Sequence, residues 1–241
     1  MTPRYRFPWQ LGVGVLEVVA AFWFSGAAAY AAGRTVSFRS EDGRAITATV
    51  FETSQRPAPA VVLVPMLGRA KDDWDAVAQR LADANILALA IDLPSQSGAG
   101  DSKVLGGWNA DVRASVSYLA SRQDVRSGSI GVAGASFGAT LAALAAADLQ
   151  AVRSLALVSP SLDYRGVRIE AAMKQYDGRP AMLMASSRDP YAARTVRELA
   201  KDPPGTREMR FSETAAHGTI LLMRDSDLVR ALVEWFQATL R

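Results

Sequence analysis

The sequence predicts an α/β fold, with a mostly parallel central sheet covered by helices on both faces. Short apolar runs rich in β-branched residues alternate along the chain with longer segments whose apolar residues recur at helical spacing. Strands that are apolar on both sides suit a parallel sheet buried between two layers of helices. The length of 241 residues, of which 49% are hydrophobic, is ample for one core of this kind.

The first part of the chain differs in composition from the rest. Arg4 and Arg6 precede an apolar stretch from Val18 to Ala29, and Ala29-Tyr30-Ala31 places small residues at the spacing of a signal-peptidase site. We therefore interpret residues 1–31 as a secretory signal. The protein is then expected to be exported, either to the periplasm or out of the cell.

Three other interpretations of this segment stay open. Residues 11–30 could form an uncleaved membrane anchor, the start codon could be mis-assigned, or the segment could be a buried N-terminal helix. Glu17, counted with the apolar residues from Leu11, makes the stretch a poor membrane span. Membrane association is expected only if the segment is not cleaved, and residues 32–241 are expected to form a single domain.

The domain is expected to begin with a β-hairpin and to continue with buried strands. Asp42-Gly43 favours a tight turn between strands at Val36–Arg39 and Ile46–Glu52. The later strands share a short, mostly apolar run with no helical periodicity. They are expected at Ala60–Val64, Ile86–Ile91, Ser129–Ala133, Leu155–Ser159, Ala181–Ala185 and Arg207–Phe211.

Helices are expected between these strands, because apolar residues there recur every three to four positions. They are expected at Trp74–Ala84, Asn109–Ser121, directly after Ser136, Ile169–Tyr176, Ala192–Ala200 and Asp225–Ala238. A regular alternation of this kind is typical of parallel strands joined by crossover helices.

The most informative motif is the Gly-x-Ser-x-Gly turn around Ser136. Gly134 and Gly138 lie two residues on either side, between a β-branched strand and an Ala/Leu-rich helix. A sharp strand-to-helix turn of this type strains the serine and exposes its Oγ. The helix that follows presents its unpaired N–H groups to any negative charge that forms beside the hydroxyl. Ser136 is therefore a candidate nucleophile.

A serine nucleophile needs a base, and the chain contains one histidine. His217 lies in a Gly-containing loop between the strand expected at Arg207–Phe211 and the C-terminal helix. Loops at strand ends are where an α/β sheet usually carries its chemistry. We therefore predict His217 as the base.

The expected third member is a carboxylate that orients the imidazole. Asp189 follows the apolar run Ala181–Ala185 and completes the chain order Ser, Asp, His. It also precedes Pro190, so it is expected to start a helix as well. Asp163 follows the preceding strand and remains the alternative acid.

Composition excludes several other functions. The formal charge of +3 comes from scattered Lys and Arg rather than from one basic face, which argues against a nucleic-acid partner. The chain has 0 cysteines and 1 histidine, so disulfides, thiolate catalysis and a zinc site are not expected. No dinucleotide or phosphate-binding glycine loop is present. We expect no cofactor and no metal.

Several motifs, taken in order, resemble the α/β-hydrolase superfamily over essentially all of residues 34–241. They are VVLVPMLG at 61–68, ALAIDLPSQSGAGDS at 88–102, and the motifs GASFG, SSRDP and AAHGT. The resemblance implies an α/β-hydrolase fold with Ser136, Asp189 and His217 as the triad. The compact layout, with too few residues for a large cap domain, is most similar to the dienelactone-hydrolase-like group of small esterases. The namesake enzymes use cysteine where this chain has Ser136.

One motif departs from the family pattern, because Pro65-Met66 replaces the usual His-Gly. In this fold two backbone N–H groups form the oxyanion hole. Phe137 is expected to supply the first and Leu67 the second, with Met66 as the alternative. Pro65 has no N–H and is excluded. The side chains of Met66, Leu67, Phe137, Leu162 and Tyr191 suggest an apolar substrate pocket, although each suits ordinary core packing equally well.

These observations predict a serine esterase that cleaves a small-molecule carboxylic ester through an acyl-enzyme intermediate. Without a cap the site is expected to be open, which favours short acyl esters or exposed ester groups on a larger molecule. An acyltransferase or a haloperoxidase would use the same triad. A non-catalytic binding or scaffold protein on the same fold is the alternative of a different class, because fold alone does not decide function.

Overall fold

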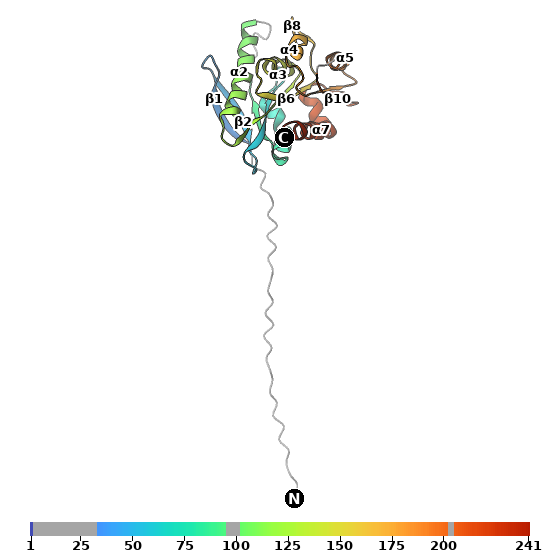
Figure 1. The fold of residues 1–241 in the computed structure, drawn as a ribbon. Coiled ribbons are helices and arrows are strands. Elements are labelled where there is room, and N and C mark those ends of the chain that lie inside the picture. The colour runs from blue at the N-terminus through green and yellow to red at the C-terminus, as the bar shows by residue number, and fades with distance from the viewer. Residues whose placement is uncertain (2–32, 95–101, 202–204) are drawn as a thin grey trace. The chain divides into compact units, whose positions relative to one another are not determined.

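The computed structural model describes Met1 and residues 33–94, 102–201 and 205–241, and the chain divides into the units Met1–Tyr30 and Ala31–Arg241 (Figure 1). All of the elements below belong to the second unit. The expected signal at 1–31 and the alternative anchor at 11–30 lie outside the described residues, apart from Met1. No helix in the described ranges is long and apolar enough to cross a membrane.

A central sheet of eight strands organises the domain, in the order β1-β2-β4-β3-β5-β6-β9-β10. Only β2 runs against its neighbours, and all the other neighbouring pairs are parallel. The strands are β1 (Arg34–Arg39), β2 (Ala45–Phe51), β3 (Ala58–Val64), β4 (Leu87–Ile91), β5 (Val125–Ala135), β6 (Val152–Val158), β9 (Ala181–Ser186) and β10 (Arg207–Ser212). The predicted mostly parallel α/β sheet is confirmed.

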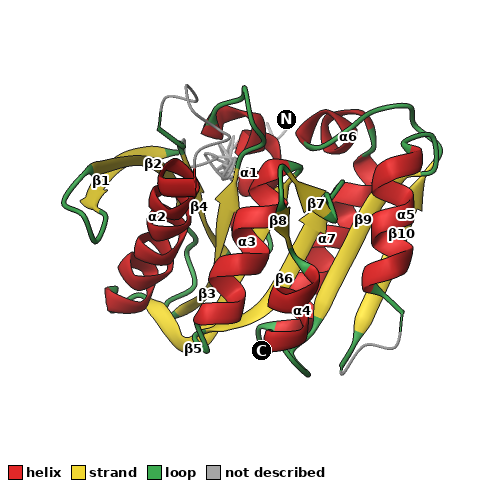
Figure 2. Cartoon of the chain, turned by 90° about the horizontal axis from the view of Figure 1, so that it is seen from above, coloured by secondary structure: helices red, strands yellow, loops and turns green. Residues whose placement is uncertain are grey.

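Helices cover both faces of the sheet, as predicted (Figure 2). One layer consists of α2 (Ser102–Ser121), α3 (Phe137–Asp148), α4 (Glu170–Gln175) and α5 (Pro190–Leu199). The other consists of η1 (Lys71–Trp74), α1 (Asp75–Asp83), α6 (Thr219–Arg224) and α7 (Ser226–Thr239).

The central strands contribute to both layers, and this explains their continuous apolar runs. In β3, Val62 and Val64 join the core beneath α2 and α3, whereas Val61 and Leu63 join the core beneath α1 and α7. All four side chains are 0% exposed. Because successive side chains of a strand point to opposite faces, a strand buried on both sides cannot alternate with polar residues.

Several boundaries differ from the sequence-based expectation. Helix α2 begins at Ser102 rather than Asn109, because Gly106 and Gly107 lower the helical signal of its first turns. Strand β5 begins at Val125 rather than Ser129. Helix α6 was not predicted, and neither was the short hairpin of β7 (Asp163–Tyr164) and β8 (Val167–Arg168), because elements this short carry almost no periodicity.

The chain between β6 and β9 is short and fully described. It holds the β7–β8 hairpin and α4 and no cap domain. Near the end of this segment, the guanidinium of Arg179 donates hydrogen bonds to the carbonyl oxygens of Ala146, Leu149 and Val152, at distances of 2.6–2.9 Å. It therefore caps the carboxyl end of α3 with a charge of the sign that a helix C-terminus favours.

The side chain of Asp225 links α7 to β10 through hydrogen bonds. Its Oδ1 accepts hydrogen bonds from the N–H groups of Asp227 and Leu228 at the start of α7, and its Oδ2 accepts one from Ser212 Oγ at the end of β10. The Ser212 hydroxyl, followed by these N–H groups, lowers the pKa of the Asp225 carboxyl. A carboxylate with a lowered pKa stabilises the fold above its unfolded-state pKa, and this contribution is lost as pH falls through the folded-state pKa.

We predict that Asp225→Ala lowers the free energy of unfolding at neutral pH by about 1–2 kcal/mol, the usual cost of a lost N-cap. Urea unfolding followed by circular dichroism measures this difference. Asp225→Asn keeps the capping oxygen and should cost less. The gap between wild type and Asp225→Ala should shrink in acid, and a gap that is constant with pH would contradict the assigned role of the carboxylate.

Candidate active site

Ser136 lies at the sharp turn between β5 and α3, as its motif predicted. Its backbone has φ of 53° and ψ of −116°, a conformation that side-chain-bearing residues rarely adopt. The turn is held by the Ser136 N–H, which donates to Val158 O of β6 at 2.8 Å. Strain of this kind persists where the surroundings over-determine the backbone, and such places are often functional.

The two flanking glycines allow backbone segments to touch. A Cβ on Gly134 would lie 2.1 Å from the carbonyl oxygen of Gly138, and a Cβ on Gly138 would lie 2.4 Å from that of Pro65. Both distances are far inside van der Waals contact, and backbone atoms cannot move away as a side chain can. Glycine at these positions therefore brings the start of α3 against β5 and against the loop that follows β3.

His217 lies in the loop between β10 and α6, and its Nε2 is 2.8 Å from Ser136 Oγ. The next residue, Gly218, has φ of 59° and donates its N–H to Ser159 Oγ at 3.0 Å. This bond anchors the histidine loop to the end of β6. The His217 side chain is 45% exposed, so the site is open to solvent on one side.

Asp189 lies on the other side of the imidazole. Its Oδ2 is 2.5 Å from His217 Nδ1, while its Oδ1 accepts from the Ala192 N–H at 3.1 Å. The carboxylate therefore contacts the histidine and caps α5 at once, the two roles expected from the sequence. The alternative acid, Asp163, directs its Oδ1 to the N–H of Gly166 at 2.7 Å, inside the β7–β8 hairpin.

These contacts select one arrangement of protons. A neutral imidazole that donates its Nδ1–H to Asp189 has an unprotonated Nε2, which accepts the hydroxyl proton of Ser136. The order of contacts is that of a serine whose proton can move to a histidine held by a carboxylate.

The loop after β3 forms a tight turn beside the start of α3. The N–H of Arg69 donates to Met66 O at 3.2 Å, and Gly68 has φ of 81°, so Leu67 and Gly68 are the central residues of a type II turn. The Leu67 N–H is not the donor of that turn bond. The Phe137 N–H is the first of α3, among those that a helix leaves without an intrahelical partner.

Met66, the residue at which the sequence departs from the expected family pattern, packs against the histidine loop. Its Sδ lies 2.5 Å from the position that a Cβ of Gly218 would occupy. A larger residue at 66 is thus accommodated by the absence of a side chain at 218. Sequence reasoning identified the departure at Met66 but not its counterpart, because the two positions are distant in the chain.

A set of hydrogen bonds that the sequence did not reveal joins the start of α6 to η1 and to the loop after β3. Asp73 Oδ2 accepts from Thr219 Oγ1 at 2.7 Å and from Arg69 Nε at 2.7 Å. The hydrogen bond from Arg69 is the main cause that lowers the pKa of the Asp73 carboxyl, with Thr219 adding to it. Thr219 directly follows Gly218 and is buried. These hydrogen bonds therefore hold the residues that follow His217 close to the loop after β3.

Aromatic and aliphatic side chains surround the start of α3. The Phe137 ring contacts Trp108 at a centroid distance of 5.3 Å and Tyr164 at 4.6 Å. Of the residues expected to line a pocket, Leu67 and Leu162 pack partly buried against this core, whereas Tyr191 is 53% exposed.

The described residues hold no group of three or more His, Cys, Asp or Glu side chains placed to bind a metal ion. We identify no cofactor-binding residues in the described site.

The chain is similar to known proteins in sequence and in fold. A sequence model of the family described as "Alpha/beta hydrolase family" matches residues 61–239. A search of curated proteins finds no match. Among solved structures, a dienelactone hydrolase from Anabaena variabilis superposes with a TM-score of 0.73 at 17% identity, covering 87% of this chain and 98% of that one.

Two esterases have similar folds. An esterase from Pyrococcus furiosus gives a TM-score of 0.69 at 14% identity, covering 87% of this chain and 91% of that one. A thermostable carboxylesterase cloned from a metagenomic library gives 0.67 at 17% identity, covering 88% and 90%. At these identities the likeness establishes the fold.

We predict that Asp189→Asn changes the tautomer of His217, because an asparagine amide can donate to Nδ1 and leave the proton on Nε2. Since the chain has 1 histidine, long-range ¹H–¹⁵N NMR spectra of the untagged protein report this ring alone. Asp163→Asn is the matched control and should leave the spectrum unchanged. An unaltered tautomer in Asp189→Asn, or a change in Asp163→Asn, would contradict the arrangement described above.

Proposed function

This chain belongs to the alpha/beta hydrolase family, and from that premise we propose that it is a serine hydrolase that cleaves carboxylic esters. The observation that carries the proposal is the continuous hydrogen-bonded chain from Ser136 Oγ through His217 to Asp189, at 2.8 and 2.5 Å. Few arrangements of side chains other than a catalytic one place a strained serine, a solvent-accessible imidazole and a carboxylate in this order.

In the first half of the proposed reaction the enzyme is acylated. His217 Nε2 takes the hydroxyl proton of Ser136 as Oγ attacks the ester carbonyl carbon. The resulting tetrahedral intermediate collapses when the bond between that carbon and the alcohol oxygen breaks. The imidazolium, stabilised by Asp189, returns its proton to the leaving alcohol.

In the second half, water releases the acyl group. His217 takes a proton from a water molecule, which attacks the acyl carbon. The bond to Ser136 Oγ breaks, and the imidazolium reprotonates the serine. The carboxylic acid leaves, and the starting state is restored. The exposed face of His217, 45% accessible, supports the entry of this water.

We assign stabilisation of the oxyanion to the backbone N–H groups of Phe137 and Leu67. Phe137 begins α3, where the helix dipole favours negative charge. Leu67 is the first central residue of the turn after β3, and the missing Cβ at Gly138 lets that loop approach the nucleophile. Because these donors are backbone groups, the replacement of the usual His-Gly by Pro65-Met66 does not remove them.

The proposed substrates are esters with short acyl groups, or ester groups exposed on a larger molecule. No cap domain is inserted between Val158 and Ala181, so nothing in that segment encloses a long chain. The aromatic and aliphatic residues around Phe137 favour an apolar acyl group over a charged one.

We predict that a fluorophosphonate probe labels Ser136 and that Ser136→Ala abolishes the labelling. The same substitution should lower the hydrolysis of p-nitrophenyl acetate by at least about a thousandfold. Mass spectrometry of the labelled peptide and initial-rate kinetics measure the two effects. Ser121→Ala, a change at an exposed serine on α2, should label and turn over like wild type. Labelling that persists in Ser136→Ala would refute the proposal.

A second prediction tests the oxyanion donor at residue 67. Proline is well tolerated at the first central position of a type II turn, so Leu67→Pro should preserve the loop while removing one N–H. We expect kcat to fall about a hundredfold or more, since that is the usual cost of one oxyanion donor. Leu67→Ala removes the side chain but keeps the N–H, and should retain most of the activity. Equal losses in both variants would point to packing instead.

A further inference from the structure

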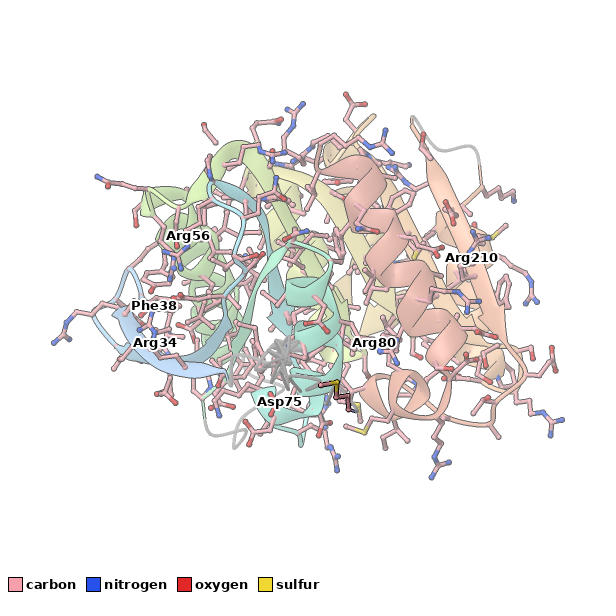
Figure 3. All side chains as sticks on the ribbon, turned by 90° about the horizontal axis from the view of Figure 1, so that it is seen from below. Arg34, Phe38, Arg56, Asp75, Arg80 and Arg210 are labelled. Atoms are coloured by element: carbon pink, nitrogen blue, oxygen red, sulfur yellow. The ribbon has the colours of Figure 1, made fainter. Side chains whose placement is uncertain are left out.

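Strand β10 is the last strand of the sheet, and its outer side is unpaired within the described part of the chain. Two large apolar side chains project from it, Met209 at 43% exposure and Phe211 at 38%. Figure 3 shows β10, with Arg210 labelled, at the outer margin of the sheet. Soluble proteins usually protect such an edge, so an apolar exposed one is informative.

The N–H and C=O groups on the outer side of β10 are placed so that another strand can form hydrogen bonds with them. The carbonyl oxygens of Thr206, directly before β10, and of Ser212, its last residue, point toward β9. They accept hydrogen bonds from the N–H groups of Ala181, the first residue of β9, and of Ser187, which directly follows β9. Because backbone groups alternate in direction along a strand, those of Arg207, Met209 and Phe211 point away from β9. The outer edge therefore offers three successive residues with outward N–H and C=O groups.

We propose that β10 pairs with β10 of a second copy of this chain, antiparallel and about a twofold axis at Met209. In this register Met209 faces its symmetry mate as a hydrogen-bonded pair, and Arg207 faces Phe211 of the other copy. The two eight-stranded sheets then continue into one another. A twofold contact of this kind is self-complementary, because the same surface serves both copies.

The charged side chains of Glu208 and Arg210 favour this register over the registers in which the twofold axis is shifted by one residue. With the axis at Met209, Glu208 lies opposite Arg210 of the other copy, and the reverse pair is formed by symmetry. Moving the axis by one residue places Glu208 opposite Glu208, or Arg210 opposite Arg210. Opposite charges across a strand pair stabilise it and like charges destabilise it. Within one protomer Glu208 and Arg210 already form an ion pair at 2.5 Å, so the dimer would carry a ring of alternating charges.

The other edge of the sheet lacks these features. Strand β1 has no exposed large apolar side chain: Val36 is buried, and Phe38 stacks on Tyr118 at a centroid distance of 4.5 Å. On β10, by contrast, Phe211 lies under the guanidinium of Arg197 at 4.8 Å and keeps an open face. The pairing is therefore assigned to β10.

Oligomeric state in solution tests the proposal. Sedimentation equilibrium of the wild-type protein from micromolar to hundred-micromolar concentration should show twice the mass of one chain. Glu208→Arg replaces two attractive pairs by two repulsive ones and should raise the dissociation constant about tenfold or more. The double variant Glu208→Arg/Arg210→Glu exchanges the charges and should restore the dimer, a rescue that general destabilisation of the strand does not produce.

Cross-linking tests the register itself. The chain has 0 native cysteines, so Met209→Cys introduces a single thiol at the proposed axis. Residues of a hydrogen-bonded antiparallel pair have Cα atoms about 5.5 Å apart, within reach of a disulfide. Mild oxidation should give a covalent dimer. Phe211→Cys is the matched control: it is similarly exposed, but it lies four residues from its symmetry mate along the strand, roughly 13 Å away, and should not cross-link.

A wild-type protein that is monomeric at every concentration would overturn the proposal. So would a dimer that survives Glu208→Arg unchanged, or equal cross-linking of Met209→Cys and Phe211→Cys. Circular dichroism of each variant, together with fluorophosphonate labelling of Ser136, establishes that the chain is folded in these measurements. Because the pairing does not involve the site, its failure leaves the proposed esterase activity unaffected.

Discussion

The close approach of backbone to backbone around Ser136 is the constraint on which the rest of the site depends. Gly134 and Gly138 let α3 begin against β5 and against the loop after β3, at distances that no side chain allows. This contact forces the strained conformation of Ser136 and turns its Oγ toward the histidine loop. It also brings the first N–H groups of α3 to the same place, so that the proposed nucleophile and one proposed oxyanion donor belong to the same turn.

Parallel strands bring the remaining groups to that turn. The carboxyl ends of β3, β5, β9 and β10 lie along one edge of the sheet, and each is followed by a loop that contributes to the site. The segments that follow these strands also contact one another, in addition to packing on the core. Met66 packs on Gly218, Thr219 bonds to Asp73, and Gly218 bonds to Ser159. These contacts position an imidazole that a loop by itself would leave mobile.

Strand β10 serves two purposes in this arrangement. Its inner side pairs with β9 and delivers His217, while Ser212 at its end is bonded to Asp225 of the last helix. Its outer side is the edge we propose for a second copy. A partner strand there would support the element that carries the histidine loop without entering the site, because the site lies beyond the end of the strand rather than along its edge.

The sequence by itself determined the fold class, the order of the longer strands and helices, and the candidate site residues, because apolar periodicity and the Gly-x-Ser-x-Gly turn are local properties of the chain. The short elements α6, β7 and β8 carried no such signal. The sequence favoured Asp189 over Asp163 as the acid, but both acids follow strands, and only the tertiary structure shows that Asp189 contacts His217 while Asp163 is bonded within its own hairpin. Only the tertiary structure revealed that Met66 packs in the space left by the missing side chain of Gly218, and that Asp73 accepts hydrogen bonds from both Arg69 and Thr219. These are contacts between loops far apart in sequence, and no local pattern encodes which loops meet.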